Sequence, residues 1–182
     1  MRLLRSLSIK DLILISAMAA LGIAVKAVVT PVIQLASAPL FIPGGSLAGG
    51  LYMMWLVMAA GITGKRGAAS LTGLVQAILV LLTGVGGSHG FLSLVSYTLP
   101  GLAIDAWLLI SRYRVCCLTC AFISCILANL VGTVAVNFIF FHLPVIPMLL
   151  SLAAAAFSGG VGGVLSWRLL CALRKYGIID ED

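Results

Sequence analysis

The sequence carries very little charge: only 9% of its 182 residues are Asp, Glu, Lys or Arg, while 62% are hydrophobic. A water-soluble domain has about 25% charged residues, and an apolar surface this extensive would aggregate in water. The composition therefore excludes an ordinary soluble domain and predicts an integral membrane protein. No linker, low-complexity stretch or repeat divides the chain, so we expect residues 1–182 to form a single membrane-embedded helical domain.

Catalytic groups are equally scarce. Before the three acidic residues at the C-terminus, the only carboxylates are Asp11 and Asp105, and the chain has two histidines. An enzyme that needs both an acid and a base has few groups to use. No P-loop, zinc-protease or dinucleotide-binding motif is present. We therefore expect no catalytic residue, no cofactor and no ATPase site in this chain, which instead binds and moves another molecule.

The five cysteines are an odd number, which excludes a disulfide framework that uses all of them. Cys117 and Cys120 have the spacing of a metal-ligand pair, but no second pair and no nearby histidine accompanies them. Because buried cysteine behaves as a small apolar residue, we expect the cysteines to be packing residues and predict no metal site.

Apolar segments separated by Gly, Pro or basic residues run along the whole chain. A helix needs about 20 residues to cross the hydrocarbon core, and the first segment exceeds the apolar region of about 7–15 residues in a signal peptide, so we expect it to be retained. The pattern predicts an all-α, polytopic membrane protein with six transmembrane helices, at Leu12–Val29, Leu47–Thr63, Ala68–Thr83, Leu92–Ile110, Val115–Phe141 and Met148–Cys171.

The basic residues predict the orientation. Ten of the eleven Lys and Arg residues lie at the two ends of the chain or in alternate loops. Lys26 is the exception. The other ten are found before the first span, between spans two and three, between spans four and five, and at or after the end of the last span. Such residues concentrate on the cytoplasmic side, so we expect both termini in the cytoplasm of a multi-pass protein of the prokaryotic plasma membrane. Lys26, near the outer end of the first span, can extend to the interface. The net charge of +6 needs no nucleic-acid partner, because basic residues next to the bilayer face anionic lipid.

Polar side chains recur at helical spacing within four of the predicted spans. Polar groups in hydrocarbon are costly and usually face the bundle interior, where they bond neighbouring helices or bind a ligand. In the predicted orientation, most of these groups fall in the outer half of the membrane and would converge on an outward-facing pocket. The polar sets are Tyr52 and Trp55; Thr72 and Gln76; Tyr97 and Asp105; and Asn129, Thr133 and Asn137.

Two spans also carry a small residue at every fourth position, a pattern that lets helix backbones approach closely. Both packing within the bundle and docking of a second membrane protein fit this pattern. The two sets are Ser16, Ala20 and Ala24 on the first span, and Ser158, Gly162 and Ser166 on the last.

Six predicted spans, cytoplasmic ends, a basic start and the Ala20–Ala24 pair resemble the substrate-binding S component of energy-coupling factor (ECF) transporters. In that family, small residues of the first helix dock onto a transmembrane coupling subunit, which two cytoplasmic ATPases drive. The resemblance implies these partners, a vitamin-like substrate captured from outside, and a docking face made of Ser16, Ala20 and Ala24.

A closer similarity is to the hydroxymethylpyrimidine/thiamine (YkoE-like) branch, carried by segments 50–55 (GLYMMW), 64–70 (GKRGAAS) and 99–105 (LPGLAID). Where that branch has acidic residues in the third span, this sequence has Gly73 and Gln76, which suits a neutral pyrimidine better than a cationic thiazolium. This likeness implies stacking by aromatic residues, hydrogen bonds from amides, a gating loop with a histidine, and a deep carboxylate that bonds a ligand amine or an internal network. The implied substrate-binding residues are Tyr52, Trp55, Gln76, His89, Tyr97, Asp105, Asn129 and Asn137.

Two other functions also fit the sequence. In a ligand-free membrane assembly subunit, the polar sets would only bond helices together. In a nickel or cobalt S component, relatives use a histidine near the N-terminus, and residues 1–5 contain none. His89 and His142 are then the remaining candidates for metal binding.

Overall fold

The computed structural model describes residues 7–37, 44–84, 92–111 and 115–177. Within these ranges every regular element is a helix and no strand is formed, which confirms the predicted all-α class for this part of the chain. The elements are α1 (Ile9–Ser37), α2 (Gly44–Thr63), α3 (Ala68–Thr83), α4 (Leu92–Ile110), α5 (Leu118–Val136), the π-helical segment η3 (Asn137–Phe141) and α6 (Val145–Lys175).

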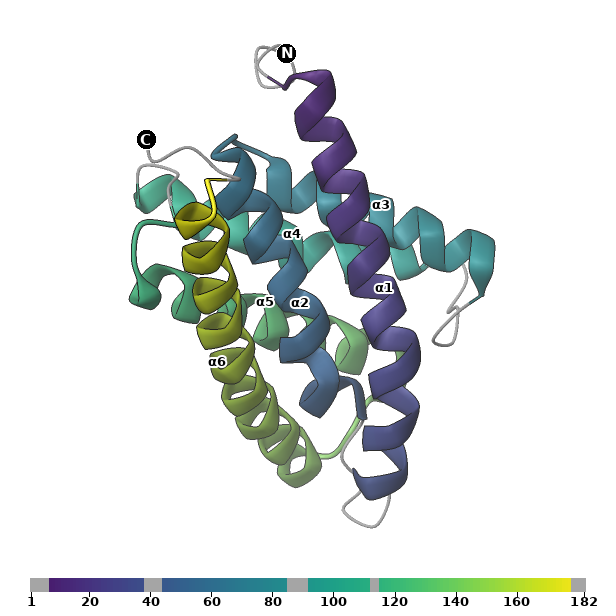
Figure 1. Cartoon of the computed structure of the whole chain (residues 1–182). Helices are drawn as coiled ribbons and strands as arrows, with labels where there is room; N and C mark the ends of the chain where they lie inside the picture. Colours follow the sequence, from purple (N-terminus) through teal and green to yellow (C-terminus); the bar gives the residue numbers. More distant parts are fainter. Residues whose placement is uncertain (1–6, 38–43, 85–91, 112–114, 178–182) are drawn as a thin grey trace.

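Helix α2 lies at the centre of the bundle. It packs against α1, α3, α5 and α6, and 61% of its most apolar stretch is buried, against 22% for α1. Figure 1 shows α1, α2 and α6 running alongside one another, with α4 and α5 behind them. The start of α1 and the end of α6 lie at the same end of the bundle (Figure 1), as an even number of crossings requires. Which end faces the cytoplasm stays a prediction.

Five of the helices in the described part of the chain are long and apolar enough to cross a membrane. These are α1, α2, α4, α5 together with η3, and α6. Helix α3 is also apolar, but its 16 residues rise only about 24 Å, less than a hydrocarbon core of about 30 Å. The structure is therefore that of a multi-pass membrane protein with five full-length apolar helices and one shorter one.

The first two helices are longer than the predicted spans. Helix α1 continues past Val29 to Ser37 and contains Pro31. Proline is tolerated inside membrane helices, because neighbouring helices and local adjustments satisfy the freed backbone carbonyl. Helix α2 begins at Gly44, within a stretch that the sequence predicts to be a break. Glycine and proline thus mark loop ends less sharply in this chain than their usual preferences indicate.

The bounds of α3 and α4 agree with the predicted spans, and those of α5 and α6 differ at their ends. Helix α5 begins at Leu118 instead of Val115. Helix α6 is longer than the predicted Met148–Cys171 in both directions and includes Pro147. A proline in the first turn of a helix loses no hydrogen bond, because the N–H groups there have no partner within the helix.

Small residues bring α2 and α6 into close contact. The Gly50 N–H donates a hydrogen bond to Ser158 Oγ at 3.0 Å, and a Cβ on Gly162 would lie 2.1 Å from the Gly50 carbonyl oxygen. Only glycine fits at position 162 without displacing a helix. Ser166, one turn further along, is also buried. The small-residue face of the last span therefore packs within the bundle, the first of the two alternatives that the pattern allowed.

Replacing Gly162 with Val should destabilise the bundle, because the new side chain would collide with the backbone of α2. Overpacking of this kind costs about 1–3 kcal/mol, so we expect a lower midpoint of thermal unfolding in detergent. Val161→Leu is the matched control, since Val161 is 44% exposed and the contact with α2 is made by the adjacent Gly162. A wild-type midpoint for Gly162→Val would contradict the close approach of the two helices.

Candidate functional site

A cavity of about 640 Å³ lies within the bundle, at the end where α1 finishes and α2 and α6 begin. Side chains from α1, α2, α4, α5, η3 and α6 line it. Its volume falls within the range of about 300–1,000 Å³ that is usual for small-molecule sites. The polar and aromatic lining residues include Lys26, Thr30, Gln34, Tyr52, Ser96, Tyr97, Asn129, Thr133, Asn137 and Ser151.

Lys26 of α1 brings a positive charge into this cavity. Its Nζ donates a hydrogen bond to the Tyr97 hydroxyl of α4. The same Nζ lies 4.5 Å from the centre of the Tyr97 ring and 5.7 Å from that of the Tyr52 ring, and aromatic faces stabilise an ammonium group at such distances. The Tyr52 hydroxyl donates to the Gly45 carbonyl oxygen at 3.1 Å. One lysine and two tyrosines therefore form a single polar and aromatic corner.

The two asparagines of the cavity also hold the fold together. Asn129 Nδ2 donates to the carbonyl oxygens of Ser46, at 3.1 Å, and Ala155, at 2.8 Å, and so joins α5 to α2 and α6. Asn137 Oδ1 accepts a hydrogen bond from the Leu143 N–H at 3.0 Å. Asn129 therefore bonds neighbouring helices and Asn137 bonds a turn. Bonding within the bundle was one of the two roles that the sequence allowed for these polar side chains.

The π-helical segment η3 forms one wall of the cavity, through Asn137 and Phe141. It ends at His142, whose backbone has a φ of 45° and whose N–H donates to the Asn137 carbonyl oxygen at 2.8 Å. The His142 side chain is exposed and does not belong to the cavity lining that the structure describes. Short π-helical turns within α-helices are frequent at functional sites.

The cavity offers a ligand positive charge and hydroxyl groups. Among the described lining residues there is no Asp, Glu, His or Cys. Thr30 Oγ1 is buried and has no hydrogen-bond partner within the described ranges. Burying a hydroxyl without a partner costs free energy, which a ligand with an acceptor or donor atom recovers. Together with Lys26, this hydroxyl suits a neutral or anionic molecule that carries acceptor atoms.

Four of the eight residues predicted to bind substrate line the cavity: Tyr52, Tyr97, Asn129 and Asn137. The structure places Trp55, Gln76 and Asp105 away from it. Trp55 packs against the hydrophobic core. Gln76 is buried between α3 and α1, where a Cβ on Gly22 would lie 2.1 Å from its Nε2. His89 lies outside the described residues.

Asp105, the last of the eight, does not line the cavity but holds the start of α3. Its Oδ2 accepts hydrogen bonds from the Ser70 backbone N–H, at 2.9 Å, and from the Ser70 hydroxyl. The first N–H groups of a helix have no partner within it, and the helix dipole favours a negative charge there. The N-cap residue of α3 is Gly67, with a φ of 84° and no side chain. Asp105 of α4 therefore provides the cap that α3 itself lacks. Of the two roles expected for this carboxylate, bonding a ligand amine or an internal network, the structure shows the internal one.

The face of α1 formed by Ser16, Ala20 and Ala24 is exposed. Ile13 and Val28, next to it on the same helix, are 64% and 70% exposed. No other described helix covers this face, in contrast to the small-residue face of α6. It is therefore available to lipid or to a partner protein.

Lys26, which the sequence predicts to extend to the membrane interface, instead lines the cavity. A signal for its role was present in the sequence. It is the one basic residue away from the predicted cytoplasmic side, and an ionisable group within a span marks a functional site by default. Ser96 and Ser151 gave no such signal, because serine is common in membrane helices.

The fold is shared with a solved structure described as "Crystal structure of an S-component of ECF transporter". The two have a TM-score of 0.79 and 20% sequence identity, over 95% of this chain and 88% of that chain. At this identity the likeness establishes the fold, which is that of an ECF-transporter S component. A comparison with curated proteins finds no match.

The family follows from the sequence itself. The family model described as "ABC-type cobalt transport system, permease component" matches residues 10–131, more than half of the chain. The chain therefore belongs to this family of transport permeases.

Replacing Asp105 with Asn should lower stability by about 1 kcal/mol, because it removes the charge that caps α3. Ser70→Ala is the comparison variant: it removes only the hydroxyl contact and keeps the backbone hydrogen bond to Asp105, so its effect should be smaller. Thermal unfolding of the purified protein measures both. If Asp105→Asn unfolds at the wild-type midpoint, the capping role is wrong.

Proposed function

We propose that this chain is the substrate-binding subunit of an ECF-type importer and that it captures a small, vitamin-like heteroaromatic molecule from outside the cell. The observation that carries the proposal is the cavity with its corner of Lys26, Tyr52 and Tyr97, within the fold of an S component. The cavity lies at the end of the bundle opposite to the start of α1 and the end of α6, where the basic residues predict the cytoplasm. In that orientation it receives its ligand from the exterior.

The chemistry of the cavity favours a neutral or anionic ring system. Tyrosine rings offer flat faces on which a heteroaromatic ring stacks, and the Lys26 ammonium donates hydrogen bonds to ring nitrogens or to an acidic substituent. The thiazolium of thiamine carries a positive charge that Lys26 would repel, and no carboxylate among the described lining residues offsets this repulsion. A neutral pyrimidine of the hydroxymethylpyrimidine type therefore fits better than thiamine itself.

Delivery to the cytoplasm requires partners in this proposal, because the sequence contains no P-loop. The exposed face of Ser16, Ala20 and Ala24 docks onto a transmembrane coupling subunit, and two cytoplasmic ATPases drive the cycle. Small residues suit this role, since they let the backbones of two helices approach closely within the membrane. The description of the family as an ABC-type transport system supports such a division of labour.

Cobalt uptake is the second candidate, and the family description favours it. Imidazole nitrogens suit first-row transition metals such as nickel, whereas thioethers are soft ligands that suit copper(I). The described lining contains the thioethers of Met53 and Met148, hydroxyls and amides, but no imidazole. A cobalt site at the cavity end of the bundle would depend on His89, outside the described residues, and on the exposed His142.

A thermal-shift panel on the purified protein tests the proposed substrate class. Hydroxymethylpyrimidine or another neutral or anionic vitamin precursor should raise the unfolding midpoint more than thiamine or Co²⁺ does. A ligand at 100 times its Kd stabilises the folded state by about 2.7 kcal/mol. Lys26→Met should weaken binding at least about tenfold, equivalent to about 1.4 kcal/mol. Lys10→Met, on the exposed start of α1, is the matched control and should bind normally.

Other outcomes of the same panel assign the competing functions. A shift with Co²⁺ alone that disappears in His89→Ala would overturn the organic substrate in favour of cobalt. The absence of any shift with the vitamins, and of any metal-ion shift that depends on His89, would support the ligand-free assembly subunit.

The docking face is tested by bulky substitutions on α1. Ala20→Trp and Ala24→Trp should abolish uptake in cells that contain the coupling subunits, while the purified variants keep their ligand affinity. Ala153→Trp is the matched control, because Ala153 is an exposed alanine on α6. Normal uptake by both α1 variants would show that this face does not dock.

A further inference from the structure

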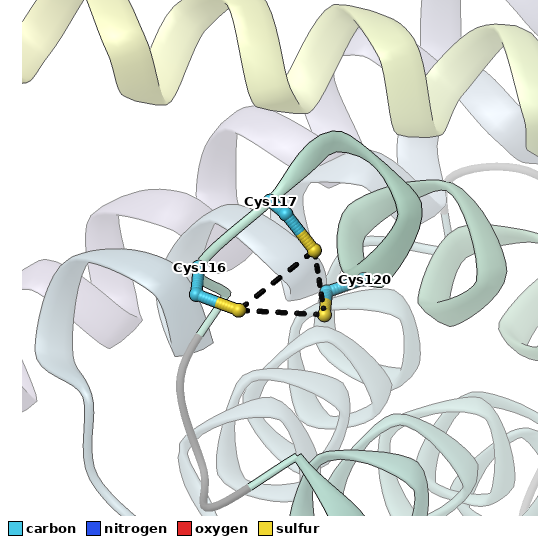
Figure 2. Close-up of side chains that lie close together, drawn as sticks. All are labelled: Cys116, Cys117 and Cys120. Atoms are coloured by element: carbon cyan, nitrogen blue, oxygen red, sulfur yellow. Dashed lines mark hydrogen bonds between the residues drawn. The ribbon is translucent and has the colours of Figure 1, made fainter.

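Three thiols meet at the start of α5, at the opposite end of that helix from the cavity wall formed by η3. The sulfur atoms of Cys116 and Cys117 lie 3.7 Å apart, those of Cys116 and Cys120 lie 3.7 Å apart, and those of Cys117 and Cys120 lie 3.1 Å apart. Figure 2 shows the three side chains pointing toward one another. All three are free thiols. The 20 residues from Cys117 to Asn137 rise about 30 Å, so this cluster is separate from the ligand cavity.

The local structure explains why the three sulfurs meet. Cys117 is the N-cap of α5, with an extended backbone at φ −150° and ψ 165°, and Cys120 lies in the first turn of that helix. An N-cap side chain lies next to that of the residue three positions later, as in a capping box. Cys116, one residue before the cap, adds the third sulfur. Local helix-start geometry therefore assembles the cluster, without the help of a distant segment.

The surroundings of Cys117 favour its thiolate, which is the form that binds metals. The first N–H groups of a helix have no partner within it and stabilise nearby negative charge. The Thr119 hydroxyl lies 2.9 Å from Cys117 Sγ. A hydroxyl at this distance can donate a hydrogen bond to the thiolate form of Cys117.

The sulfur triangle has the dimensions of a metal site. A point about 2.3 Å from all three sulfurs, the usual Zn–S distance, lies about 1 Å out of their plane. In a regular tetrahedral site with the same bond length, the metal lies about 0.8 Å out of the plane of three ligands. An ion can therefore enter with only small movements of the side chains.

We propose that Cys116, Cys117 and Cys120 form a binding site for one thiophilic metal ion, for which Zn²⁺ is the best match. Within the described residues no fourth His, Cys, Asp or Glu joins the cluster. Three protein ligands leave the fourth position open to water or an external ligand, and Cys116 is exposed. The site is therefore one at which metal exchanges with solution. It differs from the packing role that the sequence predicted for these cysteines.

The predicted location favours bound metal over a disulfide. The start of α5 lies between the fourth and fifth spans, on the side where the basic residues predict the cytoplasm. Cytoplasmic reductants keep thiols reduced. The proposal does not rest on the transport function, because it uses neither the cavity nor a coupling subunit.

Co²⁺ titration of the full-length protein, purified in detergent with a non-thiol reductant, tests the site. Cobalt bound by thiolates gives an intense sulfur-to-metal charge-transfer absorption that cobalt bound by oxygen or imidazole lacks. We expect one equivalent of Co²⁺ to produce this band and one equivalent of Zn²⁺ to remove it. Cys116→Ser, Cys117→Ser and Cys120→Ser should each weaken Co²⁺ affinity at least about tenfold, since even the loss of an outer partner of a metal ligand costs 10–100-fold. Cys171→Ser, at a free cysteine of α6, is the control and should keep the band.

Alkylation followed by mass spectrometry gives a second readout that does not depend on the variants' stability. Zn²⁺ should protect all three thiols, and a chelator should restore their labelling. The proposal is overturned by the absence of a charge-transfer band, by an equal band in a variant that lacks all three cysteines, or by a Cys117–Cys120 disulfide that blocks labelling whether or not a chelator is present. A competition with Cu⁺ that displaces Zn²⁺ at one equivalent would keep the thiolate site and reassign its ion.

Discussion

Close backbone contact around α2 is the constraint on which the rest of the structure depends. A Cβ on Gly49 would lie 1.7 Å from Asn129 Oδ1, and a Cβ on Gly50 would lie 1.8 Å from the Ser158 carbonyl oxygen. Between helices in lipid there is no hydrophobic driving force, so close packing and interhelical hydrogen bonds have to provide the attraction. The two glycines allow both, and they hold α5 and α6 against α2. The cavity is the space that this packing leaves at one end of the bundle.

The polar groups inside the membrane divide into two sets. One set makes hydrogen bonds within the fold, to neighbouring helices, to a turn and to a helix start. This set consists of Asn129, Asn137 and Asp105. Lys26 uses one of its three N–H groups on the Tyr97 hydroxyl, and Thr30 Oγ1 has no partner within the described ranges, so both keep donor groups available at the cavity wall. This division follows from the cost of a polar group without a partner in hydrocarbon: a residue that bonds the fold has little capacity left for a ligand. Substrate recognition in our proposal therefore depends on the Lys26 ammonium and on the faces of the tyrosine rings more than on the amides.

The same pattern of small residues has different surroundings on α1 and α6. Small residues at every fourth position are buried against α2 when they lie on α6, and exposed when they lie on α1. The pattern states only that a backbone can approach closely at that face. What approaches is decided by the position of the helix in the bundle: α6 borders α2 along much of its length, whereas one side of α1 faces outward.

The cysteine cluster also could not be predicted from the sequence pattern alone. The spacing of Cys117 and Cys120 is visible in the sequence, but that Cys116 joins them depends on the helix beginning at Leu118. A start three residues earlier, as the apolar pattern predicted, would place all three on regular helix positions, where adjacent residues point about 100° apart. The assembly of the cluster is thus a consequence of a boundary that hydrophobicity does not locate.

The sequence by itself determined the all-α class, the apolar character of the segments and the approximate positions of the six helices, because hydrophobicity and helix length are properties of each segment alone. The choice of cavity residues was decided by the tertiary structure. Tyr52 and Trp55 are one turn apart on α2, yet only Tyr52 lines the cavity, and Lys26 joins it from a position expected at the membrane interface. Which side chain reaches the cavity depends on the rotation and depth of each helix. Contacts between helices set both, and these contacts are distant in the sequence.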